Sequence, residues 1–133
     1  MLIRPTAKEL KEDFSDGADY YIFNAGEFGA NRHIPDVINE TAVSLNFQQR
    51  KLVILGSQYA GEMKKGVFTI MNYLMPKKGY LPLHSSCNVG LNGDVCLFFG
   101  LSGTGKTALS AVGDRALVGD DEHVWSDTGV SNI

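Results

Sequence analysis

Apolar and polar residues follow two different periods along this chain, one typical of helices and one typical of strands. Between residues 62 and 75 apolar side chains recur at helical spacing, which predicts a helix with one apolar face toward a core. The residues of that face are Met63, Val67, Ile70, Met71 and Leu74. Pro76 and Gly79 follow this stretch and are expected to end the helix.

Short apolar runs predict strands, with turn-forming residues between them. The predicted strands span residues 20–23, 51–55, 80–83 and 95–99. A turn is expected at Asn92-Gly93, between the last two of these strands. Thr6 and Glu9 form a capping box, which predicts a short helix through Phe14. The alternation of helices and strands favours an α/β fold.

A glycine-rich segment follows the apolar run at 95–99 and precedes a segment, residues 106–111, that is compatible with a helix. Its spacing, Gly-x4-Gly-Lys-Thr, matches a phosphate-binding loop in the strand–loop–helix setting where such loops occur. The glycines allow backbone N–H groups to face an anion, the lysine can reach the terminal phosphates, and the threonine hydroxyl can bind a divalent cation. The residues of this phosphate loop are Gly100, Leu101, Ser102, Gly103, Thr104, Gly105, Lys106 and Thr107.

A second apolar run, at 116–118, leads into the acidic residues Asp120 and Asp121. A carboxylate at the end of a strand can reach the metal ion that a bound nucleotide carries. Only a short helix and a turn at 113–115 separate this run from the phosphate loop, which favours a specialised, kinase-like site. Without the phosphate loop, a strand that ends in solvent-exposed acidic residues would be the default interpretation.

Taken together, these motifs resemble those of ATP-dependent phosphoenolpyruvate carboxykinase. The resemblance rests on four segments in the same order, and it extends upstream through Ile3-Arg4-Pro5 and Asn24-Ala25-Gly26. The phosphate loop lacks the cysteine of the GTP-dependent class and resembles the ATP-dependent class. The four segments are Tyr59 to Gly66, Leu83 to Gly90, the phosphate loop, and Gly119 to His123.

The resemblance implies a layout and a reaction. Residues 1–79 would be the end of the family's N-terminal substrate domain, and residues 80–133 the start of its P-loop-containing mononucleotide-binding domain. The implied activity is the ATP-dependent decarboxylation and phosphorylation of oxaloacetate to phosphoenolpyruvate, CO₂ and ADP, a step of gluconeogenesis. Because the family enzyme is several times longer than these 133 residues, the chain is expected to be an internal piece.

The resemblance also implies a role for individual residues. Lys65, His84 and Asp121 match the family's Mn²⁺ ligands, and a lysine amine can coordinate only when it is neutral. Tyr59 and Lys65 would lie at the substrate, and Lys64 and Lys106 would act on the phosphates of ATP. Thr107 would bind Mg²⁺, and Asp120 would support these groups without binding the ion directly.

Two other interpretations stay open. A different phosphate-loop kinase or NTPase would explain residues 100–107 but would leave Lys64, Lys65 and His84 without a role. Alternatively, the chain is a truncated, inactive form that binds nucleotide or metal, or associates with a full-length subunit. The family's substrate-binding arginines have no counterpart here, and Arg115 is expected to be structural or solvated.

Composition narrows the remaining classes of function. A net charge of −3 with 20% charged residues does not provide the excess of positive charge that is typical of nucleic-acid-binding proteins. No apolar stretch is long enough to cross a membrane and no secretory leader is seen, so a cytoplasmic location is expected. Cys87 and Cys96 are expected to be small buried side chains rather than a disulfide or a metal pair.

Overall fold

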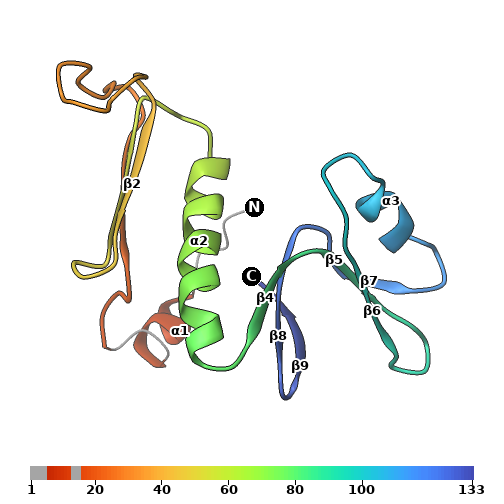
Figure 1. The fold of residues 1–133 in the computed structure, drawn as a ribbon. Helices are drawn as coiled ribbons and strands as arrows, with labels where there is room; N and C mark the ends of the chain where they lie inside the picture. The colour runs from red at the N-terminus through yellow and green to blue at the C-terminus, as the bar shows by residue number, and fades with distance from the viewer. Residues whose placement is uncertain (1–5, 13–15) are drawn as a thin grey trace. The chain divides into compact units, whose positions relative to one another are not determined.

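The computed structural model describes residues 6–12 and 16–133 and shows a mixed α/β chain (Figure 1). By its internal packing the chain divides into two compact units, Met1–Gly66 and Val67–Ile133, which are described separately below. The domain boundary expected at residue 79 stays a prediction. Of the motifs used above, Ile3-Arg4-Pro5 lies outside the described residues, as does the expected end of the first helix at Phe14.

The N-terminal unit contains a short helix and a three-stranded sheet. Its elements are α1 (Ala7–Glu12), β1 (Tyr21–Ala25), β2 (Ala42–Asn46) and β3 (Lys51–Leu55). The capping box is confirmed, because the Glu9 amide donates to Thr6 Oγ1 at 3.3 Å and the Thr6 amide donates to the Glu9 carboxylate at 2.7 Å. In the sheet, β3 lies between β1, which is parallel to it, and β2, which is antiparallel. Leu52 and Ile54 on β3 are fully buried and form the core of this unit.

Helix α2 (Gly61–Lys77) confirms the helix predicted from periodicity, but Pro76 does not end it. Pro76 lacks the N–H that would bond to the carbonyl of residue 72 and its ring crowds that carbonyl, but its fixed φ is helical and the helix continues for one more residue. The helix ends instead at Lys77, and Gly79, two residues later, has a left-handed φ of +80°. The Gly79 amide donates to Pro76 O and the Tyr80 amide donates to Met75 O, both at 3.0 Å, which is a Schellman motif. On the predicted apolar face Ile70 is buried, whereas Val67 is partly exposed.

The C-terminal unit contains two three-stranded sheets. One has the order β4-β8-β9, built from β4 (Leu81–His84), β8 (Glu122–Ser126) and β9 (Gly129–Asn132). The other has the order β6-β5-β7, built from β5 (Ser86–Val89), β6 (Val95–Phe98) and β7 (Ala116–Gly119). Helix α3 (Lys106–Ser110) connects β6 to β7.

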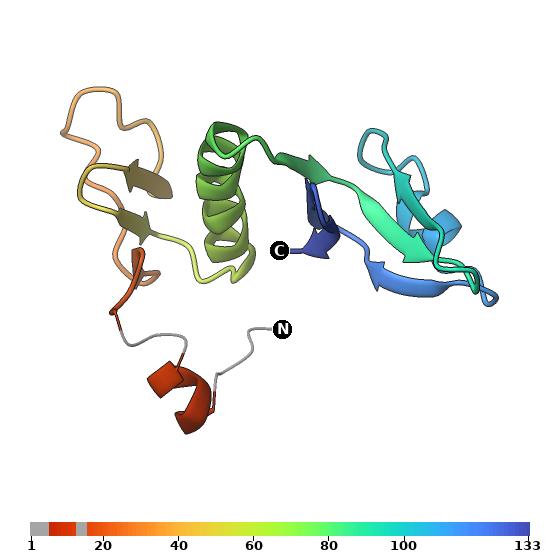
Figure 2. The same ribbon diagram turned by 90° about the horizontal axis from the view of Figure 1, so that it is seen from below.

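Strand β5 determines where the loops of this unit lie. It is antiparallel to both of its neighbours, so β6 and β7 run parallel to each other on either side of it (Figure 2). The C-terminal ends of β6 and β7 therefore lie at the same end of the sheet as the N-terminal end of β5. The turn containing Gly93 is confirmed, with φ +80°, but it joins β5 to β6 rather than the two strands predicted from sequence.

The interior of the C-terminal unit is unusually polar. Its buried apolar residues include Leu83, Cys87 and Val124. Its buried polar residues are Ser85, Ser86, Asn88, Ser110, Glu122 and His123. Cys96 is exposed, contrary to the expectation, because β6 is an edge strand of its sheet and its first residues face outward. Both cysteines are free thiols. Within the described residues no helix is long and apolar enough to span a membrane.

Candidate functional site

The phosphate loop follows β6, and its last two residues, Lys106 and Thr107, are the first two residues of α3. Gly103 and Gly105 adopt φ values of +79° and +87°, the left-handed region that residues with a Cβ rarely enter. Thr104 closes the loop on itself, because its hydroxyl donates to Leu101 O at 2.7 Å. An added Cβ at Gly100 would lie 2.6 Å from that hydroxyl, so the position leaves no room for a side chain.

Lys106 folds back over the phosphate loop. Its ammonium group donates to Gly100 O at 2.8 Å and to Leu101 O at 3.1 Å. The positive charge thus lies at the centre of the loop, where the phosphates of a nucleotide would add stronger acceptors than neutral carbonyls. Thr107, the next residue, is exposed at the first turn of α3.

The acidic segment is attached to Ser85, which connects β4 to β5, and to the start of β5 by main-chain and side-chain hydrogen bonds. The Ser85 amide donates to Asp121 O and the Ser86 hydroxyl donates to Asp120 O, both at 2.9 Å. The buried His123 ring bonds to Ser85 O through Nδ1 at 2.8 Å, so Nδ1 carries the proton. These contacts fix the backbone of both aspartates and leave their carboxylates directed outward.

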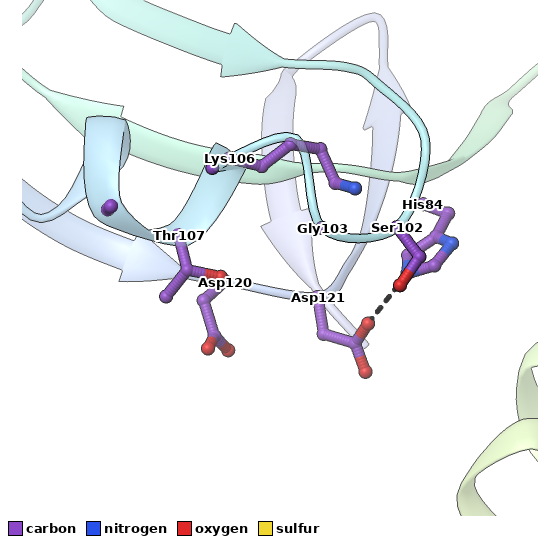
Figure 3. A pocket seen from close by; sticks show the side chains of 9 residues that line it. His84, Ser102, Gly103, Lys106, Thr107, Asp120 and Asp121 are labelled. Carbon is purple, nitrogen blue, oxygen red and sulfur yellow. Dashed lines mark ion pairs between the residues drawn. The ribbon is translucent and has the colours of Figure 1, made fainter.

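His84 and Asp121 are brought together by the register of β4 and β8. In that antiparallel pair His84 lies opposite Glu122, which places Asp121 next to the imidazole. His84 Nε2 and Asp121 Oδ1 are 2.9 Å apart, with side chains 52% and 29% exposed (Figure 3). The Phe68 ring meets the His84 ring edge-on, with centroids 6.2 Å apart.

The 2.9 Å separation is that of a direct hydrogen bond or ion pair, and it also fits two donors of one cation. Imidazole nitrogen and carboxylate oxygen are suitable donors for Mn²⁺. Two donors at about 2.1 Å from an ion and at right angles to each other lie about 3.0 Å apart, close to the observed separation. Among the described residues no group of three or more His, Cys, Asp or Glu side chains is placed to hold a metal.

The phosphate loop, the acidic segment and His84 line one cavity of about 430 Å³ in the C-terminal unit. Figure 3 shows Thr107 beside Asp120 and the Lys106 side chain on the same side as Asp121. The cavity therefore combines a cationic loop with two carboxylates and an imidazole. Its lining residues are His84, Ser102, Gly103, Gly105, Lys106, Thr107, Ala108, Asp120 and Asp121.

The other predicted site residues belong to the N-terminal unit. Tyr59 precedes α2 and is 72% exposed. An added Cβ at Gly61 would overlap the Tyr59 ring, so this glycine lets the ring lie against the start of the helix. Lys64 and Lys65 follow in the first turns of α2 and are both exposed. Their roles stay predictions.

Several residues that shape the site were missed in the sequence analysis. Ser85, Ser86 and His123 hold the acidic segment, and Asn88 contacts the end of α3. Short polar residues within a sequence carry no signal of their own, because their role depends on partners up to 38 positions away.

A scan against protein-family models matches residues 1–133, the entire chain, to phosphoenolpyruvate carboxykinase. The chain belongs to this family. Its similarity to curated members is uniform across distant organisms. It is 60% identical over its whole length to a phosphoenolpyruvate carboxykinase (ATP) of Urochloa panicoides and 59% identical to that of Dictyostelium discoideum.

These carboxykinase relatives are much longer than the chain. The chain spans 21% of the Urochloa panicoides protein and 24% of the Dictyostelium discoideum protein. The relative from Candida albicans, also named phosphoenolpyruvate carboxykinase (ATP), is 61% identical, and the chain covers 24% of it. The chain thus matches about a fifth to a quarter of the relatives, and the matched part includes the cavity described above.

Proposed function

We propose that this chain forms part of an ATP-dependent phosphoenolpyruvate carboxykinase, converting oxaloacetate and ATP to phosphoenolpyruvate, CO₂ and ADP. The observation that carries the proposal is the cavity that combines the phosphate loop with the His84–Asp121 pair, in a chain about 60% identical to enzymes of that name. A generic phosphate-loop NTPase would use the loop and a carboxylate at the metal ion that the nucleotide carries. Such an enzyme would leave His84 without a role.

In this function the phosphate loop positions the γ-phosphoryl group of ATP. Backbone amides of residues 100–107 orient the phosphates, and the Lys106 ammonium group neutralises charge as the phosphoryl group moves. Because Lys106 already lies over the loop, little side-chain rearrangement precedes binding. Lys64 is proposed as a second cation at the phosphates. Thr107 would hold Mg²⁺, with Asp120 supporting it.

At the other end of the cavity, His84 and Asp121 would hold Mn²⁺ together with Lys65. The bound ion supplies positive charge next to the oxygen that becomes negative when CO₂ leaves. His84 and Asp121 serve this role by being pre-oriented, since the β4–β8 register and the Ser85 contact fix their backbones. Tyr59 and Lys65 are proposed to orient the oxaloacetate carboxylates.

The layout implied by the family is also proposed here. Residues 1–79 would complete the N-terminal domain, and residues 80–133 would begin the mononucleotide-binding domain with its P-loop. Cytoplasmic location and association with a full-length subunit stay predictions.

The test uses the full-length protein that carries this sequence and measures phosphoenolpyruvate formed from oxaloacetate with Mn²⁺ and ATP. Lys106→Ala and Asp121→Asn should each lower kcat by about 100-fold or more, because they remove charge that acts on the reacting groups. Asp127→Asn is the matched control, since Asp127 lies in the turn between β8 and β9, outside the cavity. ATP should outcompete GTP in the same assay.

Three results would each contradict a distinct part of the proposal. Equal turnover in the parent and Asp121→Asn would place the metal chemistry elsewhere. A preference for GTP would remove the nucleotide assignment. If the purified 133-residue chain bound Mn²⁺ and ATP but formed no product from oxaloacetate, that result would support the truncated, inactive binding form instead.

A further inference from the structure

The end of α3 farthest from the phosphate loop is held by a buried amide. Asn88 on β5 is fully buried, and its Nδ2 donates to Ser110 O at 2.9 Å. Ser110 is the last residue of α3 and is also buried, and its hydroxyl donates to Thr107 O at 3.1 Å. A single helical turn therefore separates this contact from Lys106 and Thr107.

Arg115 determines which way the Asn88 amide points. Its Nε donates to Asn88 Oδ1 at 2.8 Å. An amide whose oxygen accepts from a guanidinium must present its NH₂ group on the other side, and that side is where the α3 carbonyl lies. The arginine thus makes Asn88 a donor toward α3.

Arg115 is in turn fixed by the turn between β5 and β6. Its Nη1 donates to the Asp94 carboxylate at 2.7 Å and its Nη2 donates to Asp94 O at 2.9 Å. The hydrogen bond from the guanidinium group keeps the pKa of Asp94 below its usual range. An added Cβ at Gly90 would overlap the Asp94 carboxylate and lie 2.6 Å from Arg115, so the backbone packs directly against the ion pair.

Helix α3 has few stabilising features of its own, and its other contacts include the Lys106 hydrogen bonds to Gly100 O and Leu101 O and packing against β5 and β6. It is five residues long, well below the length at which a helix is stable by itself. Its N-cap, Gly105, provides no side-chain hydrogen bond. The placement of the helix therefore depends on contacts to neighbouring elements, and Asn88 makes such a contact from the centre of the sheet.

We propose that Asp94, Arg115 and Asn88 form a positioning relay that fixes α3 and thereby sets how far Lys106 and Thr107 reach into the cavity. Asn88 is a positioning residue and acts on nucleotide binding only through α3. This inference rests on the proposed function, because it assigns the relay to the ATP site.

The test measures the ATP dissociation constant of the full-length protein with a fluorescent ATP analogue, well below the melting temperature. Asn88→Asp preserves the side-chain volume and the acceptor for Arg115 but places a carboxylate against Ser110 O. Arg115→Lys preserves the positive charge but removes the guanidinium Nε–H group, which orients the Asn88 amide. We expect ATP binding about 5-fold weaker or more for Asn88→Asp and about 2- to 5-fold weaker for Arg115→Lys. Asp114→Asn removes a neighbouring acid that makes no hydrogen bond to Arg115 and should match the parent.

A double-mutant cycle separates positioning from general destabilisation. If Asn88 acts through Lys106, then Asn88→Asp should weaken ATP binding less in a Lys106→Ala background than in the parent. Equal effects in both backgrounds, or parent-like affinity in the folded Arg115→Lys variant, would overturn the relay. The Arg115→Lys variant decides the matter if Asn88→Asp does not fold. A parent whose ATP binding is absent or independent of Lys106 would instead refute the proposed function, and the relay with it.

Discussion

Gly119 offers a sharp test of how the acidic segment is held. It ends β7, directly before Asp120, and its backbone passes close to two side chains. An added Cβ would overlap Asn132 Nδ2 and would lie 2.8 Å from His123 Nε2. Neither neighbour moves freely, because Asn132 donates to Glu122 O at 3.0 Å and the His123 ring bonds to Ser85 O at 2.8 Å.

The expected destabilisation of Gly119→Ala follows from these contacts. Forcing a methyl group into a packed site costs about 1–3 kcal/mol. Displacing Asn132 or His123 would also break one hydrogen bond, worth about 0.5–1.5 kcal/mol. Together these give a loss of about 1.5–4.5 kcal/mol in the free energy of unfolding.

Gly113→Ala is the matched control for this prediction. Nothing lies within 4 Å of a Cβ at Gly113, and its φ is not left-handed. Loss of chain entropy in the unfolded state should make this variant as stable as the parent, or about 0.4–1 kcal/mol more stable. Urea unfolding of the two full-length variants and the parent gives the comparison. If Gly119→Ala fell within about 0.5 kcal/mol of the parent, the acidic segment would be far less rigid than these contacts require.

Two further predictions concern titratable groups. Burial, and secondarily Cys96, raise the pKa of Cys87, so iodoacetamide should modify Cys96 well before Cys87 in the native protein, and equal labelling by peptide mass spectrometry would contradict the burial of Cys87. Because the hydrogen bond from Arg115 lowers the pKa of Asp94, the stability that its carboxylate contributes is present at neutral pH and is lost as the pH falls through that lowered value. The stability difference between the parent and Asp94→Asn should therefore shrink on acidification, and a constant difference would show that the ion pair does not contribute.

Local patterns in the sequence predicted the elements with strong periodicity or strong turn signals. The helix at 61–77, the strand at 51–55 and the phosphate loop are each encoded within a few neighbouring residues. Strand β5 was missed because Ser86-Cys87-Asn88-Val89 alternates over four residues only and contains a single residue, Val89, of high strand propensity; it forms a strand because β6 and β7 pair with both of its edges.

In the candidate site, too, some features follow from the sequence and others depend on tertiary structure. The adjacency of His84 and Asp121 followed from the family resemblance, and the register of β4 and β8 accounts for it physically. The hydrogen bonds from Asn88, Arg115 and Ser86 could not be predicted, because they join residues 22 to 34 positions apart through a tertiary structure that no local pattern specifies.

The central place of β5 also has a consequence for the order in which the site assembles during synthesis. The β5–β6 hairpin closes over a short turn and can form as soon as both strands leave the ribosome. The other edge of β5 can pair only after β7 has been synthesised. His84 can meet its partner only after β8 has been synthesised, and β8 follows α3 in the chain. The nascent chain therefore completes its phosphate loop first, and the His84–Asp121 pair forms last, when Asp121 emerges.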